Sequence, residues 1–245
     1  MFARGEDGVY RCEDFVSYGW LEHGFGTRNS GDWLDGRKIA ELKQVHSAEI
    51  EIVGGNWGIL GEGDGLIGRD AGVLLAIRTA DCLPVLMVDV RLKVVAAVHA
   101  GWRGIVAGIG GRAVERMGEA FGSRAEDLRV AIGPGIGECC FETGPEVARQ
   151  FFPEKKFGNE KPHVNLGEAM FGQLCETGIP AEGIFRAKLC TKCLGGEFYS
   201  YRREGQRAGR MWSAVGVREE AEKGRLARNQ PPGIPGRSLK KETAD

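Results

Sequence analysis

Hydrophobic residues along this chain fall into short runs bounded by glycine, proline and charged residues, a pattern typical of β-strands. The two most apolar runs are Leu83–Val90 and Lys93–Val98, and a charged turn separates them. Runs this apolar indicate strands that are covered on both faces. We therefore expect a central antiparallel hairpin that brings Cys82, just before the first strand, near His99, at the end of the second.

Shorter apolar runs on either side of this hairpin predict further strands. They lie within residues 14–27 and at residues 38–45, 49–53, 63–68, 73–77, 128–132, 184–189, 198–201 and 210–217. The runs at 38–45 and 49–53 are close enough in sequence to form a second hairpin, with its turn near residues 44–48.

Helical spacing of apolar residues begins after Gly104. It predicts a helix over residues 105–121, which contains glycines, and helices at 145–152 and about 166–177. Many strands and few helices, without regular strand–helix alternation, indicate the α+β class. Residues 218–245 are polar and proline-containing, so we expect a disordered tail after one catalytic domain, residues 1–217.

Composition narrows the classes of function. The 245 residues carry a formal net charge of −1, which gives no electrostatic reason to expect a nucleic acid or membrane partner. No apolar stretch reaches the length of a membrane span, and the N-terminus has no signal-peptide core. The seven cysteines show no disulfide-scaffold spacing, so we expect reduced thiols and a cytoplasmic location.

The candidate chemistry is a metal site built from distant residues. His46, Cys82 and His99 are separated by 35 and 16 residues, unlike the local spacing of a zinc finger. Two imidazoles and one thiolate leave the fourth position of a tetrahedral Zn²⁺ open, which suits a catalytic site. Such a zinc ion lowers the pKa of bound water to about 7. The alternative is a structural cysteine with satisfied core histidines.

Several motifs occur in one order and together identify a family. The chain resembles the YfiH family, also called multicopper polyphenol oxidase or laccase-domain proteins, over roughly residues 20–217. The motifs that carry the resemblance are Gly24–Arg28, Lys43–His46, Thr79–Val85, His99–Gly104, Gly133–Gly137 and Phe198–Arg203.

The resemblance implies a purine nucleoside phosphorylase, which converts adenosine, inosine or guanosine and phosphate to ribose 1-phosphate and the free base. It also implies methylthioadenosine phosphorolysis and adenosine deamination at the same site. The family's metal ligands map onto His46, Cys82 and His99, with zinc expected and copper possible. The implied fold has mixed β-sheets packed together with outer helices, related to a group of cysteine hydrolases. Partners are then small molecules, and we favour a monomer.

Further site residues follow from the chemistry of phosphate. Arginine binds phosphate through a planar fork, so Arg28 and Arg103 are candidates, with Gln44 beside a proposed ligand. Asp81 precedes the thiolate and is placed to orient a ligand or to transfer a proton. The alternatives are surface charges for the arginines and a turn cap for Asp81.

Three other functions remain open at this point. A copper-dependent polyphenol oxidase would use the same ligands, but the chain has only four histidines, too few for a trinuclear copper cluster as well. A metal-free hydrolase would use Cys82 as nucleophile and His99 as base. A small-molecule binding or redox-sensing protein would have no turnover.

The remaining cysteines do not predict a structural zinc site. Cys190 and Cys193 have C-x-x-C spacing, but no second such pair completes a zinc ribbon. Cys139 and Cys140 are adjacent in sequence, and adjacent cysteines are expected to be poor joint ligands. The sequence leaves the role of these four residues open.

Overall fold

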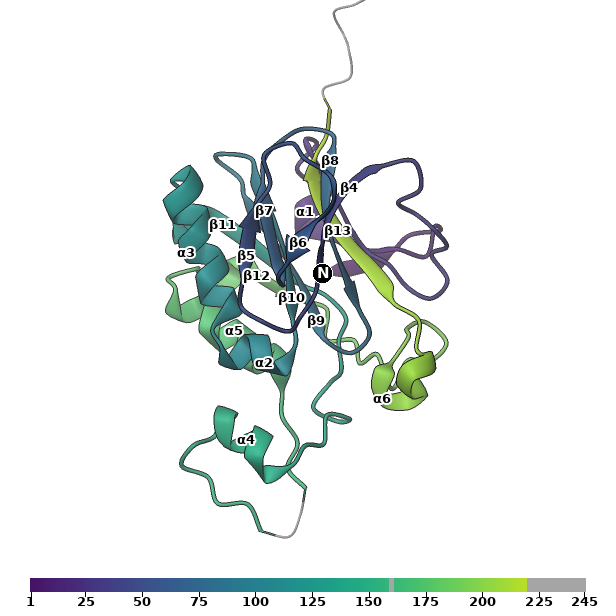
Figure 1. Ribbon diagram of the computed structural model, residues 1–245, viewed down its shortest axis with the longest axis vertical. Helices are drawn as coiled ribbons and strands as arrows, with labels where there is room; N and C mark the ends of the chain where they lie inside the picture. The colour runs from purple at the N-terminus through teal and green to yellow at the C-terminus, as the bar shows by residue number, and fades with distance from the viewer. Residues whose placement is uncertain (159–160, 220–245) are drawn as a thin grey trace, which may run out of the picture.

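The computed structural model describes residues 1–158 and 161–219, and a pair of mixed β-sheets packs face to face within them. The helices α2 (Trp102–Val106), α3 (Ile109–Phe121) and α5 (Leu166–Glu176) lie together on one side (Figure 1). This architecture confirms the α+β prediction. The predicted tail lies outside the described residues, apart from residues 218 and 219, and the domain boundary stays a prediction.

The first sheet has seven strands. Their spatial order is β1 (Phe2–Arg4), β2 (Tyr10–Cys12), β3 (Leu21–Phe25), β13 (Met211–Val217), β8 (Val73–Thr79), β4 (Lys38–Lys43) and β6 (Gly58–Glu62). The second sheet has six strands. Their order is β12 (Ile184–Arg186), β11 (Leu128–Ile132), β9 (Leu83–Asp89), β10 (Val94–Ala100), β7 (Gly65–Gly68) and β5 (Ile50–Ile52).

Strands β9 and β10 form the predicted central hairpin. They pair antiparallel, with Pro84 opposite His99, and every residue in both strands is buried. Alternate side chains serve two cores: Leu86 and Val95 pack against the seven-stranded sheet, and Met87 packs against the helices. Truncating such a side chain costs about 2–5 kcal/mol, so this hairpin is a rigid base for residues at its end.

The predicted helix at 105–121 is divided into α2 and α3. Gly108 has a left-handed conformation, φ 82°, which stops the first helix. Within α3, a Cβ at Gly110 would lie 2.8 Å from the sulfur of Met170 and from Oε1 of Gln173. Glycine therefore allows α3 and α5 to approach closely without displacing these two side chains.

Two predictions about strands are wrong. Residues 38–45 and 49–53 do not form a hairpin, because β4 joins the seven-stranded sheet and β5 joins the six-stranded sheet. The run at 198–201 is not a strand, because Ser200 caps the short helix α6 (Tyr201–Glu204) by accepting a hydrogen bond from the amide of Arg203. The short helix α4 (Pro145–Phe151) agrees with the helix predicted at 145–152. The strand β6 and the short helix α1 (Glu13–Val16) were not predicted.

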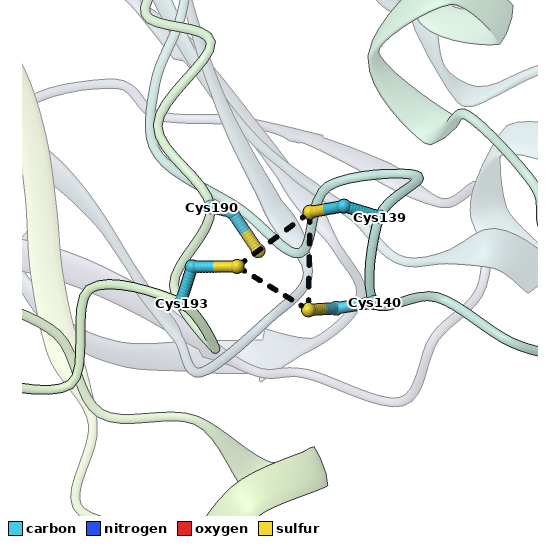
Figure 2. Close-up of side chains that lie close together, drawn as sticks. All are labelled: Cys139, Cys140, Cys190 and Cys193. Carbon is cyan, nitrogen blue, oxygen red and sulfur yellow. Dashed lines mark hydrogen bonds between the residues drawn. The ribbon is translucent and has the colours of Figure 1, made fainter.

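The four cysteines whose role was open converge at one place. The loop after β11 and the segment after β12 are bridged where Gly135 pairs with Cys190. This bridge brings the Cys139–Cys140 turn against the turn from Cys190 to Cys193, and Figure 2 shows the four sulfur atoms pointing toward one another. The adjacent cysteines thus supply the second pair that the sequence did not predict.

Candidate functional site

The three predicted ligands meet where the chain passes between the two sheets. The β4–β5 connection carries His46, the β8–β9 connection carries Cys82, and β10 ends just after His99. Their ligand atoms all lie within 4.8 Å of one another, and the two imidazole rings are 4.8 Å apart at a steep angle of 78°. The convergence expected from sequence is present in the geometry.

Asp64 holds two of these ligands in place. Its carboxylate is fully buried and lies 2.7 Å from Nδ1 of His99, which is 3% exposed. The same carboxylate accepts hydrogen bonds from the amides of His46 at 3.0 Å and Ser47 at 2.6 Å. Burial raises the pKa of Asp64, but the hydrogen bonds from His99 and Ser47 outweigh it and lower the pKa to about 2. Since an ionised carboxylate only accepts, Nδ1 of His99 donates a hydrogen bond to Asp64, and the other ring nitrogen, Nε2, is turned toward Cys82.

The thiol of Cys82 is activated by its two neighbours. Burial raises its pKa, but hydrogen bonds from His46 and His99 prevail and lower the pKa to about 6. For His99, burial lowers the pKa, while Asp64 and Cys82 raise it to about 9. The pair therefore favours a thiolate, the form of cysteine that binds metals and acts as a nucleophile.

The backbone on both sides of the site is strained. His46 has φ 61° and Asp81 has φ 90°, values that favour glycine. Each is held by hydrogen bonds, the amide of His46 to Asp64 and the carboxylate of Asp81 to Thr191, Ser200 and the amide of Arg202. The protein thus maintains an unfavourable backbone conformation at one proposed ligand, His46, and at the residue directly before another, Cys82.

These residues fit a zinc or copper ion by their donor chemistry. Imidazole and thiolate are both ligands that zinc takes, a set of three leaves a fourth position open, and a His₂Cys set also suits copper. A carboxylate that fixes the tautomer of a ligating histidine, as Asp64 does for His99, is the usual outer partner at such sites.

A cavity of about 690 Å³ opens onto the three ligands. This is within the range of about 300–1,000 Å³ that small-molecule sites occupy. Aromatic and basic side chains line it beside the ligands: Phe141, Tyr201, Lys43, Arg78, Arg202 and Arg210. The site therefore offers apolar surface and positive charge next to the candidate metal position.

Among the basic residues of the cavity, Arg202 and Arg210 differ from the others. Arg78 pairs with Glu41 at 2.9 Å and Lys43 with Glu62 at 2.6 Å. Arg202 donates to the backbone carbonyl groups of residues 140 and 142, and Arg210 to those of residues 208 and 209. Carbonyl groups do not neutralise a guanidinium, so these two side chains bring positive charge to the cavity.

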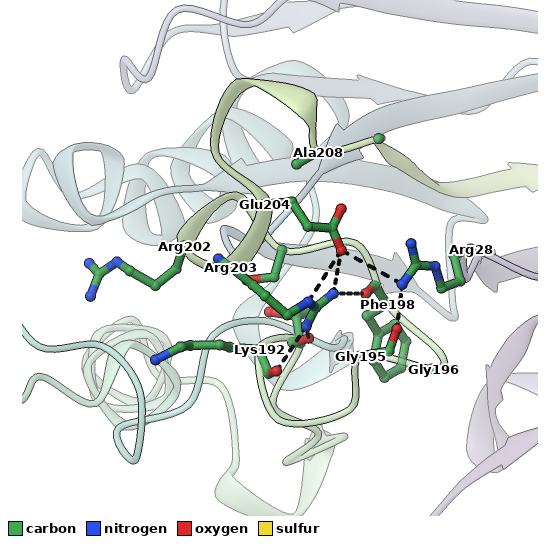
Figure 3. A network of polar contacts seen from close by, with 12 residues as sticks. Arg28, Lys192, Gly195, Gly196, Phe198, Arg202, Arg203, Glu204 and Ala208 are labelled. Carbon is green, nitrogen blue, oxygen red and sulfur yellow. Dashed lines mark hydrogen bonds and ion pairs between the residues drawn. The ribbon is translucent and has the colours of Figure 1, made fainter.

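The structure does not place Arg28 and Arg103 among the residues that line this cavity. Arg28 donates to the carbonyl of Gly195, lies 3.6 Å from Glu204 and covers the ring of Tyr199 (Figure 3). In the same view Arg202 points away from that network. Arg103 is exposed and stacks on Trp102 at 4.4 Å.

Gln44 and Asp81 line the cavity, but their side chains are engaged elsewhere. The Gln44 amide donates to the carbonyl of Arg78 and accepts from its amide, both at 2.8 Å, and so holds the β4–β5 connection against β8. Asp81 accepts from Thr191 at 2.6 Å and from the amide of Arg202 at 2.7 Å. These contacts suit positioning roles; proton transfer by Asp81 stays a prediction.

Asp64, Arg202 and Arg210 were not among the site residues predicted from the sequence. Asp64 stands between two glycines, Gly63 and Gly65, and an acidic residue in a tight glycine-flanked turn is a signal for a fixed carboxylate. The arginines carry no such local signal. Arg202 contacts the carbonyl groups of residues 140 and 142, and Arg210 lines a cavity whose other residues are distant in the sequence.

Comparisons with known proteins agree with this geometry. Residues 30–218 match the family model described as "Multi-copper polyphenol oxidoreductase laccase". The chain belongs to this family. A purine nucleoside phosphorylase from Deinococcus radiodurans is 38% identical over 76% of this chain and 73% of its own length.

Two further relatives extend the comparison. Adenosine deaminase RL5, from an unknown prokaryotic organism, is 32% identical over 71% of this chain and 72% of its own. The crystal structure of YlmD from Geobacillus stearothermophilus superposes with a TM-score of 0.81 at 28% identity, covering 89% of this chain and 99% of that one. Among the described residues, no helix has the length and apolar character needed to cross a bilayer.

Proposed function

We propose that this protein is a metal-dependent purine nucleoside phosphorylase. The observation that carries the proposal is the cavity that joins His46, Cys82 and His99 to two arginines, Arg202 and Arg210, whose hydrogen bonds within the described residues go to backbone carbonyl groups. The relatives named purine nucleoside phosphorylase support the reaction class. Adenosine, inosine and guanosine are the proposed substrates, together with phosphate, and zinc is the proposed metal.

Each wall of the cavity has a role in the proposed reaction. Phosphorolysis places a phosphate oxygen against C1′ of the ribose, and the bond from C1′ to the purine nitrogen breaks, with its electrons leaving on the base. Arg202 and Arg210 hold the phosphate by charge-assisted hydrogen bonds. Phe141 and Tyr201 offer aromatic faces on which a purine stacks.

The ligand residues supply the electrostatics of the proposed site. A bound Zn²⁺ would polarise a substrate atom that reached its open position. Asp64 keeps Nε2 of His99 turned toward Cys82, and the strained turn at His46 directs its ring at Cys82 and His99. Asp81 ties the cavity wall to the segment that carries Arg202.

The test is to incubate the zinc-reconstituted chain with adenosine, inosine and methylthioadenosine, with and without phosphate. Chromatography follows the free base and ribose 1-phosphate. We expect base release that requires phosphate and is lost in Cys82→Ala, while Cys175→Ala, outside the site, keeps it. Absence of base release from all three nucleosides by metal-loaded protein would contradict the proposal.

Adenosine deamination is a second candidate, favoured by the relative named adenosine deaminase RL5. It would convert adenosine and water to inosine and ammonia without phosphate, and the same chromatography would follow inosine. The family name favours polyphenol oxidation, but two of the four histidines lie outside the candidate metal site. His23 packs on Phe15, and His163 forms a backbone β-bridge with Glu142. A Cys82–His99 hydrolase is distinguished by a chelator, which would leave its activity intact.

A further inference from the structure

We propose that Cys139, Cys140, Cys190 and Cys193 form a second metal site, which binds one Zn²⁺ through four thiolates. The four sulfur atoms lie within 4.8 Å of one another (Figure 2). All four cysteines are free thiols. The site is separate from the His46–Cys82–His99 cluster and has a different donor set, so it does not depend on the proposed function.

The spacing of the sulfur atoms matches tetrahedral coordination. A tetrahedron with zinc–sulfur bonds of about 2.3 Å has sulfur–sulfur edges of about 3.8 Å. Cys139 lies 3.8 Å from Cys140 and 3.6 Å from Cys193, and Cys140 lies 3.4 Å from Cys193. The sulfur of Cys190 lies within 4.8 Å of the other three. A disulfide requires about 2.05 Å, so these separations suit ligands around one ion better than a disulfide.

The surrounding backbone prepares the site for charged sulfur. The amide of Gly137 donates to the sulfur of Cys190 at 3.3 Å, a contact that stabilises a thiolate. A Cβ at Gly137 would lie 3.2 Å from the Cys139 sulfur and from Cβ of Cys190, so glycine allows the two loops to approach. Two parallel-bridge hydrogen bonds, from the amide of Gly135 to Leu189 and from that of Thr191 to Gly135, hold the loops in register.

Two arginines hold the loops that carry the four cysteines, and one of them, Arg203, also pairs with Glu204 at 2.6 Å. Arg202 donates to the carbonyl of Cys140 at 3.3 Å. Arg203 donates to the carbonyls of Thr191 and Lys192 at 2.9 and 2.8 Å, inside the turn that bears the other two cysteines. Both loops are thus tied to one arginine pair at the start of α6.

The second site lies directly behind the wall of the nucleoside cavity. Thr191, between Cys190 and Cys193, donates to the Asp81 carboxylate at 2.6 Å, and Asp81 precedes Cys82. Arg202 reaches both the cavity and the Cys140 carbonyl. Zinc at the four cysteines would therefore have a structural role, because it would hold the loops that position Asp81 and Arg202.

The test measures zinc per chain by elemental analysis after reconstitution with Zn²⁺ under reducing conditions and removal of loose metal. We expect about two zinc ions in the unaltered protein and about one in Cys139→Ser/Cys193→Ser, which changes the two exposed cysteines. Cys82→Ala should also retain about one, and the triple variant none. Cys175→Ser, a half-buried thiol outside both clusters, is the matched control and should keep both.

The outcomes separate this proposal from the first site. Equal zinc content in Cys139→Ser/Cys193→Ser and unaltered protein would overturn the four-cysteine site and leave the His46–Cys82–His99 site standing. If the double variant fails to fold, alkylation of the cysteines in the unaltered protein, with and without zinc, tests the site instead. Bound zinc should protect the exposed Cys139 and Cys193 until a chelator is added; equal labelling with and without zinc, or a disulfide between them under reducing conditions, would overturn the proposal.

Discussion

The carboxylate of Asp64 lies 2.7 Å from Nδ1 of His99, and both side chains are buried. Asp64 also accepts the amides of His46 and Ser47, so one carboxylate fixes a ring on β10 and the loop that carries a second ring. The contact joins two segments that are 35 residues apart in sequence. It explains how ligands from separate connections acquire a common geometry.

Asp64→Asn should weaken metal binding at the first site by about 10–100-fold, the usual cost of losing an outer-shell carboxylate. The amide can accept from His99, but its NH₂ group cannot accept from Ser47, so the loop bearing His46 loosens. Competition with a chromophoric chelator measures the affinity. Asp35→Asn, at an exposed turn, is the control, and equal affinity in the two variants would contradict the role of Asp64.

Gly101→Ala should lower metal affinity and activity with little change in fold stability. The new Cβ would lie 3.0 Å from Cδ2 of His46 and 3.1 Å from the sulfur of Cys82. The backbone at Gly101, φ −75°, accepts alanine, so the effect comes from displaced ligands. Gly172→Ala, in α5 with open space around it, is the control and should stabilise by about 0.5–1 kcal/mol. Unchanged zinc content in Gly101→Ala would refute this contact.

Arg202→Gln and Arg210→Gln should each raise the KM for phosphate by about tenfold or more, because a charge-assisted hydrogen bond is worth about 1.5–3 kcal/mol. Steady-state rates with varied phosphate at saturating nucleoside measure this. Arg103→Gln and Arg28→Gln are assayed beside them. The prediction made from sequence for Arg28 and Arg103 gives the opposite order, so a larger rise in those two variants would favour it.

Stability should fall as the pH falls from 6.5 toward 4 because of His23. Nε2 of His23 accepts from the amide of Cys12 at 3.0 Å, and burial lowers its pKa from 6.5 to about 4. Between these values the unfolded chain binds more protons than the folded one, so acid favours unfolding by up to about 3 kcal/mol. Below pH 4 both states are protonated and this loss ends.

Urea unfolding at several pH values measures the effect. His23→Gln keeps an acceptor but does not titrate, so its unfolding free energy should depend less on pH between 4 and 6.5. His163→Gln changes an exposed histidine and serves as the control. The same pH dependence in His23→Gln and unaltered protein would refute the assignment.

The central hairpin was predictable because its information is local. Two fully apolar runs joined by a charged turn have few alternatives to antiparallel pairing, and Cys82 and His99 stand at its open end. The strand at 38–45 was identified correctly, but its partner was not. Adjacent strands usually pair, and here the strained turn at His46 instead carries the chain to the other sheet.

The order of the motifs and the types of their residues were sufficient, without coordinates, for the α+β class, the family and the expected convergence of His46, Cys82 and His99. Only the tertiary structure decided that Asp64 anchors two ligands, that Arg202 and Arg210 reach the cavity, and that four cysteines converge. These arrangements join segments that the chain separates, such as His99 with Asp64 across 35 residues. Hydrophobic periodicity determines which face of an element is buried, but the partner of a polar side chain depends on how the sheets and loops pack.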